Sequence, residues 1–300
     1  DGVDMAGVPA YERPTNMMFQ SYALFPHMTV EQNVAFGLHQ DGLPKSEIRT
    51  LVSDMLALVQ MTKFAKRKPH QLSGGQRQRV ALARSLVKKP KVLLLDEPLG
   101  ALDKKLREQT QFELVNIQEK VGTTFVMVTH DQEEAMTMAS RIAVMNEGVI
   151  RQLGTPFELY EYPNSRFTAN FLGQVNLIEG TLVDDDEKYA VIHSDDAGGE
   201  IYIDHAVQGH EGATLWIALR PERLRLLTEK PTDTKYNCLS GKVEEIGYLG
   251  GLSTYHVRLD SGFRIKVTEP NSSRHIEPRY TWEDRVWVTW EAGAASVLNQ

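Results

Sequence analysis

Two short apolar runs, separated by one helical segment, limit the folds open to this chain of 300 residues. The runs are "KVLLLD" at 91–96 and "TTFVMVTH" at 123–130, and polar turns bound both. Apolar runs without alternation are typical of strands that are buried on both faces, as in a parallel sheet. The helical segment 103–122 between them is long enough for a crossover connection. We therefore predict a βαβ unit and an α/β fold.

Two further helices are predicted ahead of this unit. Residues 46–61 carry an apolar stripe at helical spacing, and Ser46 can serve as the N-cap. A second helix follows Gly74 and Gly75 and ends at Pro90, because proline cannot continue a helix.

The pattern changes after about residue 173. Short alternating stretches such as "EIYIDHAV" and "FRIKVTEP" follow one another, with turn residues between them at close intervals. This pattern predicts a small all-β barrel domain. The expected domains are therefore 1–173 and 174–300.

Composition excludes several classes of protein. The formal net charge of −7 argues against a dedicated nucleic-acid binder. One cysteine, Cys238, excludes an intramolecular disulfide framework and suits a reducing compartment, where it is expected to be a half-buried apolar residue. No apolar run approaches the roughly 18 residues that a membrane-spanning helix needs.

Acidic and imidazole side chains stand where the two apolar runs end. Asp96 and Glu97 close the first run, and His130 closes the second. Parallel strands end at the same edge of a sheet, where ligands of α/β proteins bind. One acid can hold Mg²⁺, and the other can face an attacking water. The alternative is a solvated strand end that leads into a turn.

The stretch "HQLSGGQRQRV" at residues 70–80 has the features of a phosphate site. Ser73 stands at an N-cap position, and Gly74 and Gly75 expose backbone N–H groups at a helix N-terminus. A glycine-rich turn into a helix is the simpler alternative. No G-x-x-x-x-G-K-[ST] loop occurs in the chain.

The order "LSGGQ", "LLLDEP", "ALD" and "TH" resembles the ATP-binding-cassette (ABC) ATPases over residues 1 to about 173. "MMFQSYALFPHMTV" is similar to their Q-loop, and "GALD" to their D-loop. The β-rich remainder resembles the oligosaccharide-binding-type (TOBE) domain of bacterial importer ATPases. The resemblance implies an incomplete P-loop NTPase-type α/β domain, with a helical subdomain at about 30–90, followed by an all-β OB-like domain.

The resemblance also implies roles for particular residues, with ATP and Mg²⁺ as cofactors. The implied roles are Glu97 as general base, His130 as γ-phosphate sensor, Gln20 as a catalytic and Mg²⁺-binding glutamine, Asp96 as the other Mg²⁺ partner, Asp103 as the D-loop residue that reaches across a dimer interface, and Ser73, Gly74, Gly75 and Gln76 as the clamp on the opposite subunit's ATP.

The sequence around these motifs is similar to that of the polyamine branch of the family, especially the putrescine importer ATPases. The resemblance implies an ATPase subunit that is paired with a second copy or a related subunit and is peripheral on the cytoplasmic face of the bacterial inner membrane. It implies two transmembrane permease subunits, contacted through the Gln20–Leu38 region, and a periplasmic solute-binding protein. Import of iron, sulfate or sugars stays an alternative, because the ATPases of those importers share many of the same sequence motifs.

Two other functional classes remain open. A non-transport ABC ATPase could act on nucleic acid through Trp282, Trp287 and Trp290, although these are expected in the barrel core. From Gln174 onward, however, 21 acidic residues stand against 13 basic ones, and nucleic-acid grooves need the opposite balance. A non-catalytic regulatory chain is disfavoured because Gln20, Glu97 and His130 all suit hydrolysis.

We predict that this 300-residue chain neither binds ATP tightly nor hydrolyses it, because a P-loop supplies most of the positioning and charge for phosphoryl transfer. The chain begins without methionine in a turn-rich loop, so we expect it to be an excerpt. Expressed alone, it should expose apolar faces of "VLLLD" and "FVMV" and aggregate. Calorimetric titration with ATP checks the prediction, and an affinity typical of ATPases would contradict it.

Overall fold

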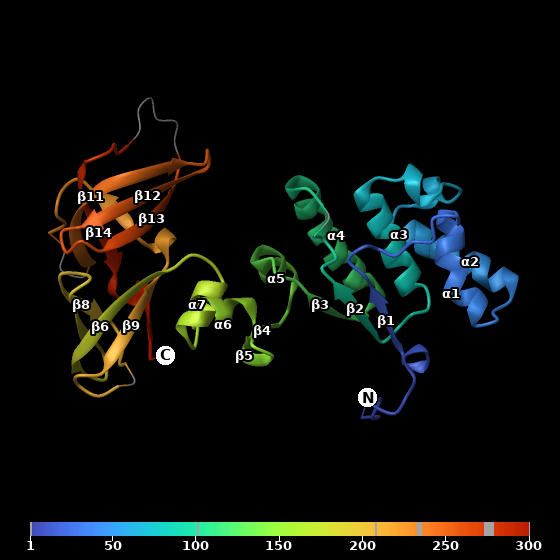
Figure 1. The fold of residues 1–300 in the computed structure, drawn as a ribbon, viewed down its shortest axis with the longest axis horizontal. Coiled ribbons are helices and arrows are strands. Elements are labelled where there is room, and N and C mark those ends of the chain that lie inside the picture. Colours follow the sequence, from blue (N-terminus) through green and yellow to red (C-terminus); the bar gives the residue numbers. More distant parts are fainter. Residues whose placement is uncertain (1, 101, 208, 233–235, 273–278, 300) are drawn as a thin grey trace. The chain divides into compact units, whose positions relative to one another are not determined.

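The structure of the chain, a computed structural model, describes residues 2–100, 102–207, 209–232, 236–272 and 279–299 (Figure 1). It divides into two compact units, Asp1–Ala139 and Ser140–Gln300, and each has its own hydrophobic core. The change of sequence pattern at about residue 173 therefore lies inside the second unit.

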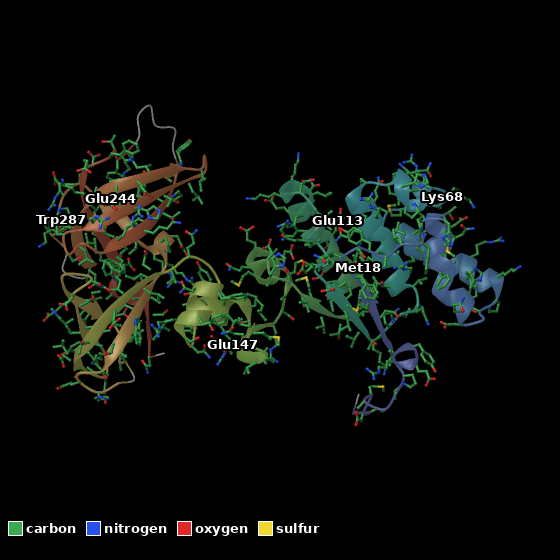
Figure 2. The ribbon with its side chains drawn as sticks, in the orientation of Figure 1. Met18, Lys68, Glu113, Glu147, Glu244 and Trp287 are labelled. Carbon is green, nitrogen blue, oxygen red and sulfur yellow. The ribbon has the colours of Figure 1, made fainter. Side chains whose placement is uncertain are left out.

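The first unit is built on three parallel strands in the order β1-β2-β3. They span Thr15–Met18, Val92–Asp96 and Thr124–Val128. Helix α4, Lys104–Val121, connects β2 to β3 and confirms the predicted βαβ unit. Met18 at the end of β1 is 1% exposed and lies in the core of this unit (Figure 2).

One face of this sheet keeps its apolar side chains exposed. Leu93 and Leu95 are buried, whereas Leu94, Val126 and Val128 are 37%, 48% and 62% exposed. The prediction that both strands are buried on both faces is wrong here, because successive side chains point to opposite faces and only one face is covered. The expected exposure of apolar side chains of "VLLLD" and "FVMV" is confirmed.

Helices α1, α2 and α3 form the helical part of the first unit and share its core. They span Val30–Gln40, Lys45–Leu58 and Gly74–Leu86, with 3₁₀ turns at Ala10–Glu12, Thr62–Phe64 and Pro69–Gln71, and α5, Gln132–Met138, follows β3. The predicted cap of α2 is wrong: Pro44 occupies the N-cap, and Ser46 lies inside the first turn. The helix also ends before residue 61, since Gln60 adopts a left-handed φ of 58°.

The buried amide of Asn33 fixes the loop that leads into α1. Its Oδ1 accepts a hydrogen bond from the Phe25 N–H at 2.8 Å, and its Nδ2 lies 3.1, 3.3 and 3.0 Å from the carbonyl oxygens of Phe25, Met28 and Thr29. Asn33 is 0% exposed, so water cannot replace these bonds.

The second unit begins with a hairpin and two short helices. The bounds are Ile142–Asn146 for β4, Val149–Gly154 for β5, Pro156–Glu161 for α6 and Arg166–Phe171 for α7. Arg220 ties both helices to the β-strands that follow: its Nη1 donates to Ala169 O at 2.9 Å, and its guanidinium lies 4.1 Å from the centre of the Tyr160 ring. Burial of this cation in contact with backbone carbonyls fixes the start of the all-β part.

The remaining strands form two antiparallel sheets around one core. The sheet orders are β15-β9-β6-β7-β8 and β10-β14-β11-β12-β13. Their bounds are Asn176–Asp185 for β6, Ala190–Ser194 for β7, Gly199–Ile203 for β8, Thr214–Leu219 for β9, Arg225–Leu227 for β10, Tyr236–Tyr248 for β11, Leu252–Leu259 for β12, Arg264–Pro270 for β13, Arg285–Glu291 for β14 and Ala295–Leu298 for β15, with 3₁₀ turns at Pro221–Arg223 and Ala292–Ala294. Ile178 and Ile217 from one sheet and Val257 and Val288 from the other belong to the same apolar cluster.

The tryptophans of the second unit have different environments. Trp290 is buried, Trp287 is half-buried and Trp282 is 72% exposed, so the expectation of three core tryptophans is wrong for Trp282. Cys238 is partly buried, as expected, and burial raises the pKa of its thiol. Among the helices of the described residues, none combines the length and apolar character needed to cross a membrane.

Replacement of Asn33 by alanine should lower the free energy of unfolding of the first unit by about 2 kcal/mol, because the Phe25 N–H loses the buried amide that accepts its hydrogen bond. Urea unfolding followed by circular dichroism at 222 nm measures this loss, since the longer helices lie in the first unit. All four tryptophans lie in the second unit, so their fluorescence provides an internal reference.

The matched control is Asn116→Ala on the exposed side of α4. A loss of equal size in both variants, or none in Asn33→Ala, would contradict the assigned role of the Asn33 amide.

Candidate active site

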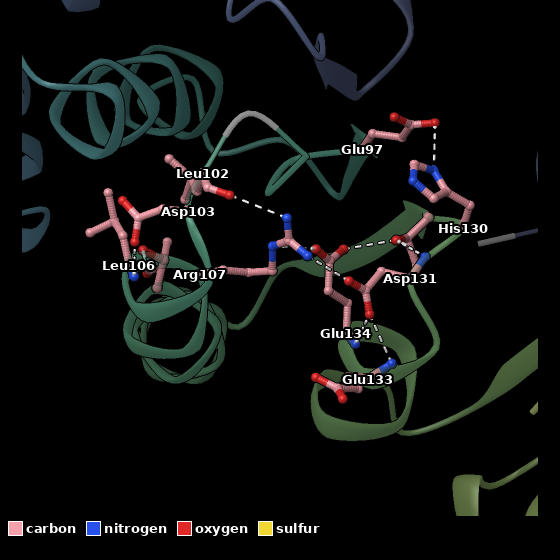
Figure 3. A network of polar contacts seen from close by, with 11 residues as sticks. Glu97, Leu102, Asp103, Leu106, Arg107, His130, Asp131, Glu133 and Glu134 are labelled. Carbon is pink, nitrogen blue, oxygen red and sulfur yellow. Dashed lines mark hydrogen bonds and ion pairs between the residues drawn. The ribbon is translucent and has the colours of Figure 1, made fainter. Parts of the chain in front are cut away.

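Three side chains from the ends of the three parallel strands meet at Glu97. Gln20 follows β1, Glu97 follows β2 and His130 follows β3. Gln20 Nε2 donates to Glu97 Oε2 at 2.6 Å, and His130 Nδ1 lies 3.1 Å from Glu97 Oε1 (Figure 3 shows the Glu97–His130 pair). The predicted meeting of the two strand ends is confirmed, and each oxygen of the Glu97 carboxylate has one partner.

The backbone at Glu97 is held in an unusual conformation. Its φ is 42°, in the left-handed region that costs a residue with a Cβ about 1–3 kcal/mol. Its N–H donates to Val128 O at 2.9 Å, which extends the pairing of β2 with β3 by one residue. The Gly100 Cα follows so closely that a Cβ there would lie 3.5 Å from Glu97 Oε2. This turn leaves the carboxylate in contact with Gln20 after β1 and His130 after β3.

Exposure differs within the cluster. The Glu97 side chain is 29% exposed and the His130 side chain is 78% exposed. An ionised carboxylate only accepts hydrogen bonds, so the contact places a hydrogen on His130 Nδ1 and leaves Nε2 toward solvent.

Asp96 and Gln20 each offer an oxygen atom of the kind that could bind Mg²⁺. Asp96 ends β2, is partly buried and makes no side-chain hydrogen bond or ion pair within the described residues. Gln20 uses its Nε2 toward Glu97, which leaves its Oε1 as a second hard donor. Mg²⁺ is commonly held by one or two protein oxygens together with phosphates and water. In the same described part of the chain, no three His, Cys, Asp or Glu side chains form a complete ligand cluster.

Helix α3 holds the segment that follows Gln20. Arg84 donates to Tyr22 O at 2.9 Å and to Ala23 O at 2.7 Å, and its guanidinium lies 5.4 Å from the centre of the Phe25 ring. Tyr22 and Ala23 have φ values of 62° and 43°, so these bonds hold a strained backbone. Burial lowers the pKa of the Arg84 guanidinium. The position of Gln20 is therefore tied to the helix that begins at the "LSGGQ" stretch.

The "LSGGQ" stretch forms the N-terminus of α3. Ser73 is the N-cap, as predicted: its Oγ accepts from the Gln76 N–H at 3.3 Å, and Gln76 Oε1 accepts from the Ser73 N–H at 3.0 Å. A Cβ at Gly75 would lie 3.3 Å from Leu106 Cδ2, so glycine permits close packing on α4. The N–H groups of the first turn have no intrahelical acceptor, which leaves those of Gly74 and Gly75 for a ligand. Within the described residues, no hydrogen bond or ion pair joins this turn to Glu97 or His130.

Asp103 is the N-cap of α4. Its Oδ1 accepts a hydrogen bond from the Leu106 N–H at 3.0 Å. Sequence reasoning found Asp103 and His130 but missed Arg107, whose Nη1 donates to Asp131 Oδ2 at 2.7 Å. One signal for this contact was available in the sequence. Asp131 directly follows His130 and precedes "QEE", a pattern typical of a helix N-cap, so it marked Asp131 as a residue that fixes the loop.

Sequence profiles of two families match the chain. The profile described as "ABC transporter" matches residues 1–100, and the one described as "TOBE domain" matches residues 217–298.

Curated relatives match along almost the whole chain. The chain is 56% identical to the putrescine transport ATP-binding protein PotG of Escherichia coli K12 over 299 residues, which cover 100% of the chain and 79% of the relative. It is 48% identical to the spermidine/putrescine import ATP-binding protein PotA of Rubrobacter xylanophilus, over 99% of the chain and 78% of the relative. For PotA of Thermotoga maritima the identity is 45%, over 100% of the chain and 82% of the relative.

Proposed function

The chain belongs to the ABC transporter ATP-binding proteins, and we propose that its complete subunit hydrolyses ATP to drive the import of polyamines, putrescine in particular. The observation that carries the proposal is the meeting of Gln20, Glu97 and His130 at the carboxyl ends of three adjacent strands. The names of the relatives support the substrate class, since they are polyamine transport and import proteins. Import of iron, sulfate or sugars stays the alternative for the substrate.

Glu97 is the proposed general base. Its two carboxylate oxygens are oriented by Gln20 and His130, so the group is held ready for the proton of an attacking water. The partial exposure of the Glu97 side chain gives a water access to it. His130 is the proposed γ-phosphate sensor through Nε2. Because Nδ1 already faces Glu97, Nε2 is the ring nitrogen that remains for a phosphate oxygen.

Mg²⁺ would be held by Asp96 and by Oε1 of Gln20, where it would supply positive charge to the phosphates. The oxygen donors at the strand ends support this assignment. Gln20 would then contact the general base through Nε2 and the metal ion through Oε1, so a movement of Gln20 would affect both.

The residues of the "LSGGQ" stretch are proposed to contact ATP that is bound by a second copy of the subunit. Ser73, Gly74, Gly75 and Gln76 would clamp the ATP of the other subunit, and Asp103 would reach across the same interface. The free N–H groups of the first turn of α3 support a phosphate contact. The absence of polar contacts between this turn and the Glu97 cluster, within the described residues, supports action in trans.

The membrane partners are proposed to contact the Gln20–Leu38 region. Asn33 and Arg84 hold this region by its backbone, which supports a segment that transmits motion as a unit. The subunit would lie on the cytoplasmic face of the inner membrane with two permease subunits, and a periplasmic binding protein would deliver the solute.

In the complete subunit, Glu97→Gln should lower the rate of ATP hydrolysis by about 100-fold or more while ATP still binds, because the amide cannot accept the water proton. Phosphate release and equilibrium nucleotide binding measure the two effects. Glu119→Gln, an isosteric change on the exposed face of α4, is the matched control. Hydrolysis at the wild-type rate in Glu97→Gln would overturn the assignment of the base.

Transport is tested in cells that lack their own putrescine uptake and express the complete transporter. Uptake of labelled putrescine should require intact Glu97 and should be inhibited by excess spermidine but not by sulfate or maltose. Uptake of sulfate, iron or a sugar in place of putrescine would overturn the substrate and leave the ATPase assignment intact.

A further inference from the structure

Arg107 on α4 lies between two loops that belong to the proposed site. Its Nη2 donates to Leu102 O at 3.2 Å, in the residue before Asp103, and its Nη1 donates to Asp131 Oδ2 at 2.7 Å, in the residue after His130 (Figure 3). A planar guanidinium makes both bonds in one fixed geometry. Its two Nη atoms therefore set the distance between the Leu102–Asp103 segment and the loop that carries His130.

The loop that carries His130 is fixed on both sides of the histidine. Before it, Thr129 Oγ1 accepts from the Asp131 N–H at 3.0 Å and donates to Glu134 Oε2 at 2.8 Å. After it, Asp131 Oδ1 accepts from the N–H groups of Glu133 at 2.9 Å and Glu134 at 3.2 Å. A shift of Asp131 therefore moves the loop as a unit, and His130 moves with it.

Electrostatics make this arrangement depend on Arg107. Glu134 is 2% exposed, and burial raises the pKa of its carboxyl, opposed by Thr129, Arg107 and His130. Arg107 Nε lies 3.7 Å from Glu134 Oε1. Without the guanidinium, the carboxylates of Asp131 and Glu134 would face each other with no cation between them, and like charges at short range repel.

We propose that Arg107 is a positioning residue that couples the Asp103 segment to His130, so that a displacement of this segment is transmitted to the Glu97 cluster. The coupling runs from Leu102 O through the guanidinium to Asp131, and from His130 Nδ1 to Glu97 Oε1. The inference rests on the proposed function, in which the Asp103 segment meets a second copy. It adds a residue whose side chain has no role in binding ATP.

A second ion pair on the same helix provides the control. Arg79 Nη2 and Glu113 Oε1 lie 2.6 Å apart and join α3 to α4, with side-chain exposures of 27% and 33%. The Arg107 and Asp131 side chains are 30% and 24% exposed. The two pairs are alike in length and exposure. Arg79 lies in the 70–80 stretch, so the control variant changes its partner Glu113, which lies on α4 outside the proposed site.

The experiment compares Arg107→Gln, Arg107→Lys and Glu113→Gln in the complete ATPase subunit. Arg107→Gln should lower kcat by about tenfold with KM for ATP unchanged within about twofold, the size of effect expected along a coupling network. Amide hydrogen exchange should become faster in both 102–106 and 129–134. Arg107→Lys should have a kcat and exchange rates between those of the wild type and Arg107→Gln, because an ammonium keeps the charge but cannot make both bonds in the fork geometry. Glu113→Gln should leave kcat and the exchange of both segments unchanged.

Equal behaviour of Arg107→Gln and Glu113→Gln would overturn the inference, as would a loss of kcat without faster exchange in 129–134. If circular dichroism shows that Arg107→Gln is unfolded, the test is made with Arg107→Lys. A wild-type kcat together with wild-type hydrogen exchange in Arg107→Lys would then overturn the inference. A wild-type subunit that does not hydrolyse ATP would instead overturn the proposed function, and hydrogen exchange would still test the coupling.

Discussion

The site depends on the parallel pairing of β1, β2 and β3. Gln20 and Glu97 are 77 positions apart and Glu97 and His130 are 33 apart, yet a shared strand edge brings the three within hydrogen-bond distance. Parallel strands in register end together, so the pairing of Met18 with Leu95 and of Leu95 with Met127 determines where these side chains lie. A shift of one residue in either register would turn the side chains to the other face and separate the cluster.

Two helices connect the sheet edge to more distant parts of the first unit. Through Arg84, α3 holds the backbone after Gln20, and through its N-terminus it presents the "LSGGQ" turn. In the same way α4 is capped by Asp103 and holds the His130 loop through Arg107. In both helices an arginine makes the connection: Arg84 bonds two backbone carbonyls, and Arg107 bonds one backbone carbonyl and the Asp131 carboxylate. Such contacts transmit displacement because a planar guanidinium that bonds two segments has few alternative positions.

The second unit is stabilised by a different principle. Two antiparallel sheets share a core of aliphatic side chains, and Arg220 joins the hairpin-and-helix segment to them through backbone carbonyls. This contact explains why residues 140–173 belong to the second compact unit although the sequence pattern changes only after about residue 173. The sequence pattern changes where the strands of the two antiparallel sheets begin. The boundary of a compact unit lies instead where few contacts cross between the two parts of the chain.

By itself, the sequence determined the βαβ unit, the all-β second part, the N-cap at Ser73 and the identity of the residues at the strand ends. These features are local: they follow from apolar periodicity, cap chemistry and the position of glycine and proline. The N-cap of α2 at Pro44 and the exposed Trp282 could not be predicted, because they depend on which layers cover each element. Only the tertiary structure decided that Gln20 and His130 bind the two oxygens of Glu97 and that Arg107 joins Leu102 to Asp131. Hydrogen bonds between residues so far apart in the chain form only after the strands and helices have packed, so no local pattern records them.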